Sequence, residues 1–469
     1  MKKVHYLSII LSVLLFQACA SRIDTSTLVS EPEQIQTLKT KHFYSDRNIS
    51  GNVENNWLKT FNDNTLDALA HEALEKNPNL RVAAFSVEEA VAQTSLAAAA
   101  LKPTVGYNAG VSNTTTGASS AAGGVGASWQ PDVWGRVSAQ VQSTLSSQRA
   151  IEADYAFAKQ SLVADVSKAW FSLIESTKQE KLSAQIVKDY ESTLDIVTTK
   201  FEVGQVLRKD VAQANADLNA AKDSHIQAKN AVQNSSRALE LLLGRYPSAE
   251  MSAGVDLPKL SAFPATGIPT DLLQRRPDLI SKEEQLRSAF FATKDAELSR
   301  LPTFTLSVGG GLNNASNFIG LLAAGISGPI YTGGAIEAEI KGANASQKKA
   351  IASYEATILS AFKDVETSLA NEKVLQERSV VLSLAVQDYK TALADTKVQY
   401  ELGQIDLTLV QVQQRKLNAS RSTDLHVKSL LLQNRVNMYL ALGGGFDDEA
   451  AGAQVKKSIK EDKEKEDTK

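Results

Sequence analysis

Histidine and cysteine, the residues that most often bind transition metals or take part in nucleophilic catalysis, are sparse in this chain. It has one cysteine and five histidines among 469 residues, and His225 has no second histidine or cysteine at a ligand spacing. The glycine-rich stretches "GGVGAS" and "SVGGGL" lie in alternating, strand-like segments rather than in a turn that binds phosphate. We therefore expect no enzyme activity, no catalytic residue, no metal site and no cofactor.

The single cysteine, Cys19, follows a segment with the features of a secretory signal. "MKK" precedes the apolar run "VHYLSIILSVLLF", and "QACA" supplies small residues at its end. An exported chain with one thiol cannot form an internal disulfide. The position of Cys19 resembles the lipidation site of bacterial lipoproteins, which predicts a signal peptide over 1–18, acylation of Cys19 and sorting to the outer membrane. An ordinary signal peptide, with Cys19 removed or free, is the alternative.

Composition limits the class of protein further. Apolar residues make up 43% of the chain but aromatic residues only 6%, a balance that favours long helices packed through small side chains. The formal net charge is -3, and no long basic patch carries interleaved aromatic residues. Nucleic acid is therefore not an expected partner.

The chain repeats itself at a fixed interval. Gly204 in "FEVGQV" and Gly403 in "YELGQI" are 199 residues apart. The same offset relates seven further pairs: Pro78 and Pro277, Pro103 and Pro302, Gly135 and Gly334, Asp165 and Asp364, Tyr190 and Tyr389, Asn219 and Asn418, Gly244 and Gly443. Most of these residues are glycine or proline, which form turns and end helices or strands. The chain is therefore predicted to contain one supersecondary unit twice.

Each unit is predicted to contain a helix, a β-hairpin, a long helix and a further helix. The expected organisation is a signal peptide at 1–18, an extended segment at 19–64, a first repeat at 65–245, a linker at 246–264, a second repeat at 265–445 and a charged, disordered tail at 446–469. Pro78 is expected in the first turn or at a kink of the first helix.

Two pairs of alternating segments follow Pro103 and Pro302. "TVGYNAGVS" places Val105 and Tyr107 on one face, and "TFTLSVGGGL" places Phe304 and Leu306 at the equivalent positions. Strands of about ten residues with one apolar face are typical of transmembrane barrels. We expect these four side chains to contact lipid, with an ordinary half-buried hairpin as the alternative. Four strands cannot close a barrel, so several chains must share one.

The longest segments carry heptad patterns. Apolar and small residues recur at alternating spacings of three and four from about 136 to 201, and again after 207. A helix of about 65 residues is about 100 Å long. Gly204 and Gly403 interrupt these patterns and can adopt the left-handed conformation that reverses a chain. They are predicted to be the turns at the tips of two helical hairpins.

The duplicated unit resembles the TolC-like outer-membrane efflux proteins, and its lipoprotein start resembles their acylated branch. "LLQRRPDL" at 272–279 is similar to the family's entrance to the second repeat. "WQPDVWGR" at 129–136 and "GPIYTGG" at 328–334 are similar to its two junctions between strand and long helix. The resemblance covers about 55–445.

That resemblance implies a mainly α protein with membrane β-structure. Three protomers would share one 12-stranded β-barrel, four strands each, joined to a trimeric α-helical coiled-coil barrel. The homotrimer would accept small toxic compounds or drugs from a periplasmic adaptor protein and an inner-membrane pump of the RND type. A duct for type I protein secretion has the same fold, and a structural coiled-coil envelope fibre is an alternative of another class.

The resemblance also identifies residues of a periplasmic gate. The family's tip is held by a tyrosine and an aspartate whose positions match Tyr400 and Asp210 here. Where its best-known members carry an arginine and two carboxylates, this chain has Ile405, Leu409 and Val412. We predict closure by apolar constriction at Leu409 and Val412, helped by a hydrogen bond between Tyr400 and Asp210, and low sensitivity to divalent cations.

Two alternatives remain open at this tip. A shift of one residue in register would turn Asp406 or Gln411 toward the lumen. The second alternative is that Asp210 has no role in the gate and only stabilises the start of its helix, as an aspartate in a first turn does.

Overall fold

The structure is a computed structural model that describes residues 55–113, 119–254, 256–260, 263, 275–312 and 318–446. The signal peptide, Cys19 and the charged tail therefore lie outside the described residues. The described chain divides into two compact units. The strand unit contains 85–154 and 278–358, and the helical unit contains 55–84, 155–277 and 359–446.

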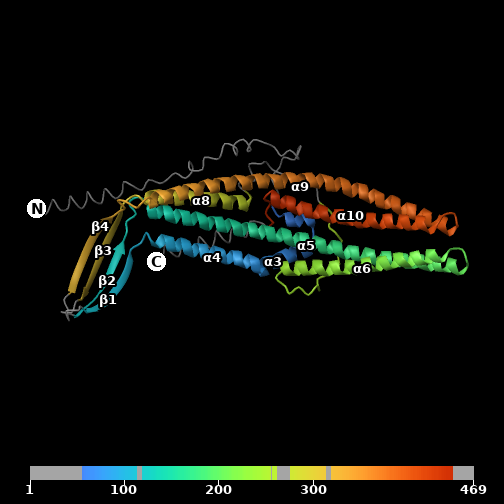
Figure 1. The fold of residues 1–469 in the computed structure, drawn as a ribbon, viewed down its shortest axis with the longest axis horizontal. Helices are drawn as coiled ribbons and strands as arrows, with labels where there is room; N and C mark the ends of the chain where they lie inside the picture. Colours follow the sequence, from blue (N-terminus) through green and yellow to red (C-terminus); the bar gives the residue numbers. More distant parts are fainter. Residues whose placement is uncertain are drawn as a thin grey trace. The chain divides into compact units, whose positions relative to one another are not determined.

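The strand unit contains four antiparallel strands in the order β1-β2-β3-β4 (Figure 1). They are β1 (Thr104–Asn113), β2 (Ser119–Trp129), β3 (Thr303–Leu312) and β4 (Phe318–Ser327). Thr104 pairs with Ser128 in the first hairpin, and Thr303 pairs with Ser327 in the second. Both hairpins therefore have the same register when the 199-residue offset is applied.

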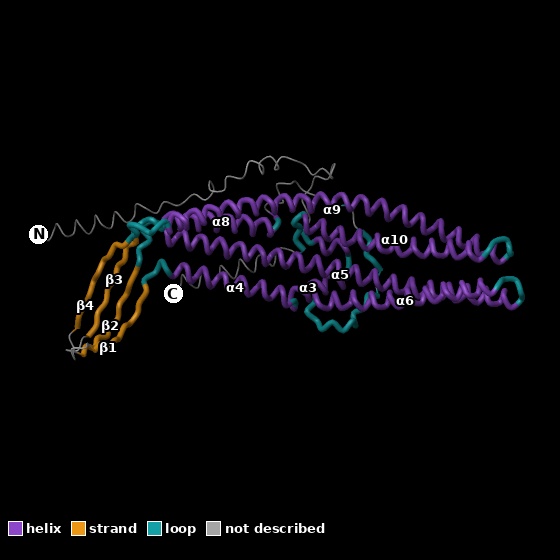
Figure 2. Tube along the Cα trace, viewed as in Figure 1, coloured by secondary structure: helices purple, strands orange, loops and turns teal. Residues whose placement is uncertain are grey.

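The bounds of the helices in the two repeats also differ by 199 residues. Figure 2 shows these helices in purple. The first set is α4 (Pro78–Ala99), α5 (Arg136–Glu202) and α6 (Arg208–Leu242), and the second is α8 (Pro277–Leu298), α9 (Ala335–Glu401) and α10 (Leu407–Ala441). Both α5 and α9 have 67 residues, and both α6 and α10 have 35. None of the helices in the described ranges carries an apolar stretch long enough to cross a membrane.

The turns of the two helical hairpins are built alike. Gly204 has a φ of 75° and Gly403 a φ of 73°, both in the left-handed region. After α5, Gln205 N donates to Lys200 O at 2.8 Å, and after α9, Gln404 N donates to Gln399 O at 2.9 Å. These bonds satisfy carbonyls that a helix end leaves without partners. The predicted hairpin turns at the two glycines are present.

The opposite ends of α6 and α10 are capped by equivalent residues of different chemistry. Asn77 donates from Nδ2 to Leu242 O at 2.8 Å, and Arg276 donates from Nη1 to Ala441 O at 3.2 Å. Arg276 belongs to the "RRPD" motif and also lies 3.6 Å from the carboxylate of Asp364. One arginine of that motif therefore caps a helix of the same repeat.

The N-terminal part of the described chain is not extended as expected. Residues Trp57–Phe61 form the 3₁₀ helix η2, and α3 (Asn64–Lys76) follows it. The Trp57 ring stacks on Tyr439 with centroids 5.6 Å apart, and both rings lie in the main hydrophobic core of the helical unit. Burial of a large aromatic side chain outweighs the preference of a polar segment to stay extended.

The first helix predicted for the first repeat is two helices in the structure, and of the two positions expected for Pro78 the first turn is the one observed. Asn77 is extended, with a ψ of 122°, and ends α3. Pro78 is the first residue of α4, where its missing N–H costs no hydrogen bond.

Candidate functional site

The junction between β2 and α5 is organised by the "WQPDVWGR" motif. Asp132 accepts hydrogen bonds from Val137 N at 3.0 Å and Ser138 N at 2.7 Å, which lie in the first turn of α5. Gly135 supplies the left-handed residue before the helix, with a φ of 76°. The motif therefore begins the 67-residue helix immediately after the strand ends.

The same motif joins the two repeats inside the strand unit. The Trp134 indole donates to Pro302 O at 2.7 Å, and its ring lies 6.2 Å from that of Phe304. Arg136 Nε forms an ion pair with Asp295 at 3.0 Å. Three contacts thus hold the start of α5 against the end of α8 and the start of β3.

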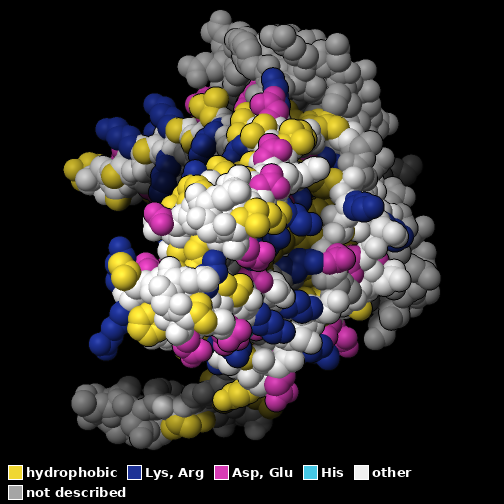
Figure 3. Space-filling model, turned by 90° about the vertical axis from the view of Figure 1, so that its right-hand side faces the viewer, with side chains coloured by type: hydrophobic (Ala, Val, Ile, Leu, Met, Phe, Trp, Pro, Cys, Tyr) yellow, Lys and Arg dark blue, Asp and Glu magenta, His cyan; other side chains and the backbone are white. Residues whose placement is uncertain are grey.

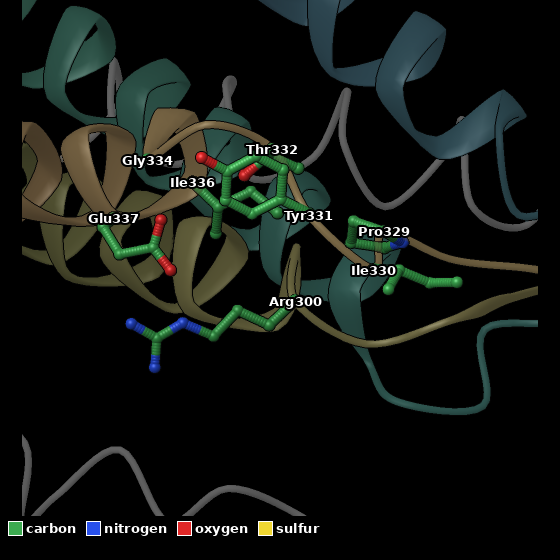
Figure 4. A pocket seen from close by; sticks show the side chains of 8 residues that line it. All are labelled: Arg300, Pro329, Ile330, Tyr331, Thr332, Gly334, Ile336 and Glu337. Carbon is green, nitrogen blue, oxygen red and sulfur yellow. The ribbon is translucent and has the colours of Figure 1, made fainter.

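The second junction, "GPIYTGG", lacks the equivalent contacts. Tyr331 occupies the position of Asp132 and is 90% exposed, and Ile330 is fully exposed. A pocket of about 390 Å³ lies here, lined by Arg300, Pro329, Ile330, Tyr331, Thr332, Gly334, Ile336 and Glu337 (Figure 4). Side chains just beyond the end of β4 are therefore accessible in the part of the chain that the structure describes.

The four residues predicted to face lipid share one face of the sheet. The register pairs Val105 with Ala127 and Tyr107 with Val125, while Leu306 pairs with Trp129 and Phe304 with Ile326. Val105 and Tyr107 are 73% and 88% exposed. Phe304 is partly covered because it contacts Trp134.

The tips of the two helical hairpins meet in a buried group that we call the tip cluster. It consists of Val197, Ala214, Leu393, Tyr400, Leu407, Val410 and Leu417. Figure 3 views the end at which the two turns lie, where apolar side chains are interspersed with lysine, arginine and acidic residues. The tip cluster includes residues of α5, α6, α9 and α10, so it joins both hairpins.

The predicted hydrogen bond between Tyr400 and Asp210 is not formed. Asp210 accepts from Leu207 N at 2.9 Å and closes the first turn of α6. The Tyr400 hydroxyl is buried and has no hydrogen-bond partner within the described part of the chain. Burial, together with the nearby Asp210 carboxylate, raises the pKa of this hydroxyl. Asp210 serves its own helix because a local backbone donor lies within reach.

The residues predicted to close the gate lie on the first turns of α10. Leu409 is 44% exposed and Val412 is half-buried, whereas Ile405 packs against the tip cluster. Asp406 is exposed, and Gln411 is only 3% exposed. Of the two polar candidates, Asp406 therefore remains accessible and Gln411 does not.

One residue at the tip was not anticipated from the sequence. Lys200 donates from Nζ to Tyr400 O at 2.9 Å and lies over the Tyr400 ring. A lysine near the end of a helix commonly interacts with the carbonyls of that helix. No sequence signal indicates that this one contacts the other hairpin.

Comparisons with known proteins agree with this geometry. The sequence profile described as "Outer membrane efflux protein" matches residues 69–245 and 268–444. The chain belongs to this outer membrane efflux protein family. The family consists of channels, so the prediction that the chain is not an enzyme is confirmed. The predicted fold of a helical tunnel joined to a β-barrel and the place in an efflux system are confirmed as well.

Individual relatives cover most of this family member. It is 29% identical over 433 residues to the toluene efflux pump outer membrane protein TtgC of Pseudomonas putida, covering 87% of this chain and 88% of TtgC. It is 26% identical to SilC of Salmonella typhimurium, named a probable outer membrane lipoprotein, covering 85% of this chain and 90% of SilC. The open-state MtrE channel of Neisseria gonorrhoeae has a TM-score of 0.78 and 26% identity, covering 87% of this chain and 96% of MtrE.

The junction geometry makes a prediction about stability. Asp132→Ala removes the acceptors of two backbone N–H groups and should lower the free energy of unfolding by about 0.5–2 kcal/mol. Asp132→Asn keeps one acceptor oxygen and should lose less. Urea unfolding followed by circular dichroism measures both values, and equal losses in the two variants would contradict the capping role.

Proposed function

We propose that three copies of this chain form one tunnel through the outer membrane. The observation that carries the proposal is the four-stranded sheet, in which β1 and β4 are edge strands. Each unpaired backbone group costs several kcal/mol in hydrocarbon. Two copies would supply eight strands, and the interior of an eight-stranded barrel is filled by side chains. Three copies would supply twelve strands, which enclose a lumen wide enough for a tunnel.

The assembled tunnel would carry small toxic compounds to the outside of the cell. TtgC is named a component of a toluene efflux pump, and the similarity covers most of both chains. A periplasmic adaptor and an inner-membrane pump of the RND type would deliver the substrate. Val105, Tyr107, Phe304 and Leu306 would then form part of the surface that contacts lipid.

The duplication predicts how neighbouring chains pair. In the β2–β3 contact Val125 pairs with Gly310. The residue equivalent to Val125 in the second repeat is Ala324 on β4, and the residue equivalent to Gly310 in the first repeat is Val111 on β1. If β4 of one chain pairs with β1 of the next as β2 pairs with β3, Ala324 and Val111 are directly opposed. Directly opposed residues of antiparallel strands lie about 4.5–5.5 Å apart at Cα, a distance that a disulfide spans.

Oxidising the double variant Ala324→Cys with Val111→Cys should link chains into covalent trimers on non-reducing gels. Ala324→Cys with Gly110→Cys is the matched control, because residues adjacent in a strand point to opposite faces and should crosslink poorly. Folded protein that remains monomeric after oxidation would refute the shared barrel.

We also propose that the periplasmic end is closed by Leu409 and Val412. Both lie on the first turns of α10, and apolar constrictions can gate a pore by dewetting. Leu409→Ser with Val412→Ser should raise single-channel conductance in planar bilayers, because two hydroxyl groups favour water in the constriction. Ile226→Ser with Leu241→Ser, on exposed positions of α6, is the control. Strong block of the wild type by divalent cations from the periplasmic side would indicate a carboxylate ring instead.

We propose that Cys19 carries lipid, a role supported by its place after an apolar signal and by the similarity to SilC. Several acyl chains bind a membrane far more firmly than one. Replacing Cys19 by Ser, with a signal-peptidase site placed before it, should abolish labelling by radioactive palmitate while leaving pore conductance unchanged. Undiminished labelling would rule out acylation at Cys19.

A further inference from the structure

The tips of the two helical hairpins are joined by one lysine. Lys200 is in the last turn of α5, and its Nζ donates to the main-chain oxygen of Tyr400 at 2.9 Å. The same Nζ lies 4.0 Å from the centroid of the Tyr400 ring. One cation therefore contacts both the main chain and the side chain of a single residue on the other hairpin.

The chemistry of the α9 end suits a cation. Tyr400 is the next-to-last residue of α9, so its carbonyl is among those that lack a partner within the helix. Gly403 N donates to this oxygen at 3.1 Å, and Lys200 supplies a second donor. The negative end of a helix and the face of an aromatic ring each attract a positive charge. Because Lys200 is half-buried, solvent screens these attractions less than at an exposed site.

Tyr400 and two glutamines of α10 carry buried polar groups that have no hydrogen-bond partner in the described part of the chain. The Tyr400 hydroxyl, the Gln411 amide nitrogen and both amide atoms of Gln414 are buried without a hydrogen bond in the part of the protomer that the structure describes. Helical spacing places both glutamines on the face of α10 that carries Leu407, Val410 and Leu417 of the tip cluster. Buried polar groups without partners weaken the packing around them. The packing of the second helical hairpin against the first in the tip cluster is therefore weaker than that of a fully apolar cluster.

The duplication shows that the lysine is specific to one hairpin. The 199-residue offset places Gln399 at the position of Lys200 and Tyr400 at the position of Phe201. Gln399 is exposed and uncharged. The equivalent cation is therefore missing from the second hairpin.

We propose that Lys200 is a positioning residue that fastens the tip of the second hairpin to the first and so holds the gate closed. This inference rests on the channel function proposed above. Without the cation, the tip cluster with its unpaired Tyr400, Gln411 and Gln414 groups no longer holds the α9–α10 turn. The first turns of α10, which carry Leu409 and Val412, then leave the constriction.

Hydrogen exchange of the full-length protein in detergent tests the fastening directly. Lys200→Met keeps the apolar stem and removes the charge, and amides over 398–412 should exchange about tenfold faster than in the wild type. Lys200→Arg should restore slow exchange. Lys188→Met, at an exposed position of the same helix, is the matched control and should exchange as the wild type does. Unchanged exchange at the tip in Lys200→Met, or faster exchange spread over the whole chain, would overturn the proposal.

Single-channel recording in planar bilayers distinguishes a failure of the Lys200 proposal from a failure of the proposed channel function. If neither the wild type nor the Leu409→Ser, Val412→Ser variant conducts, the channel function fails while the exchange result still decides whether Lys200 fastens the tip. If the serine variant conducts, Lys200→Met should raise the open fraction of single channels, and Lys200→Arg should return it toward the wild-type value. An open fraction in Lys200→Met equal to that of the wild type would show that Lys200 does not hold the gate.

Discussion

Backbone hydrogen bonding in hydrocarbon is the constraint on which the architecture depends. A strand inside a membrane has no water to satisfy its edge, so a sheet that spans a membrane must close on itself. This chain supplies four strands and leaves β1 and β4 at the edges. The described sheet is therefore open at both edges, and the pocket beside Tyr331 lies just beyond the end of the edge strand β4.

The helices of the helical unit face a similar constraint at their C-terminal ends, where backbone carbonyls have no partner within the helix. At the tips, a glycine with positive φ closes each helix with its own backbone. At the opposite ends, a side chain from the preceding segment caps each helix, with Asn77 in one repeat and Arg276 in the other. The same geometric requirement is therefore met by different residues at equivalent positions of the two repeats.

Sequence patterns predicted the features that local chemistry determines. The strands after Pro103 and Pro302, the turns at Gly204 and Gly403 and the length of the helices all follow from backbone restrictions or from periodic burial. The hydrogen-bond partners of individual side chains could not be predicted from the sequence in the same way. Asp210 was assigned to Tyr400, yet it bonds to Leu207 N three residues away, and Lys200 takes the contact with Tyr400. The 3₁₀ helix at 57–61 was missed because stacking of Trp57 on Tyr439, far away in sequence, determines it.

The offset of 199 residues also has a consequence for symmetry. In the proposed ring of three protomers the six helical hairpins would alternate between two kinds, so contacts around the ring would alternate as well. A chain built from one unrepeated unit would need six copies, and every substitution would then appear at all six contacts. Here Lys200 and Gln399 occupy equivalent positions with different chemistry. Duplication thus allows the contacts made by the first helical hairpin to differ in chemistry from the equivalent contacts made by the second. Strict sixfold symmetry would require both sets of contacts to be identical.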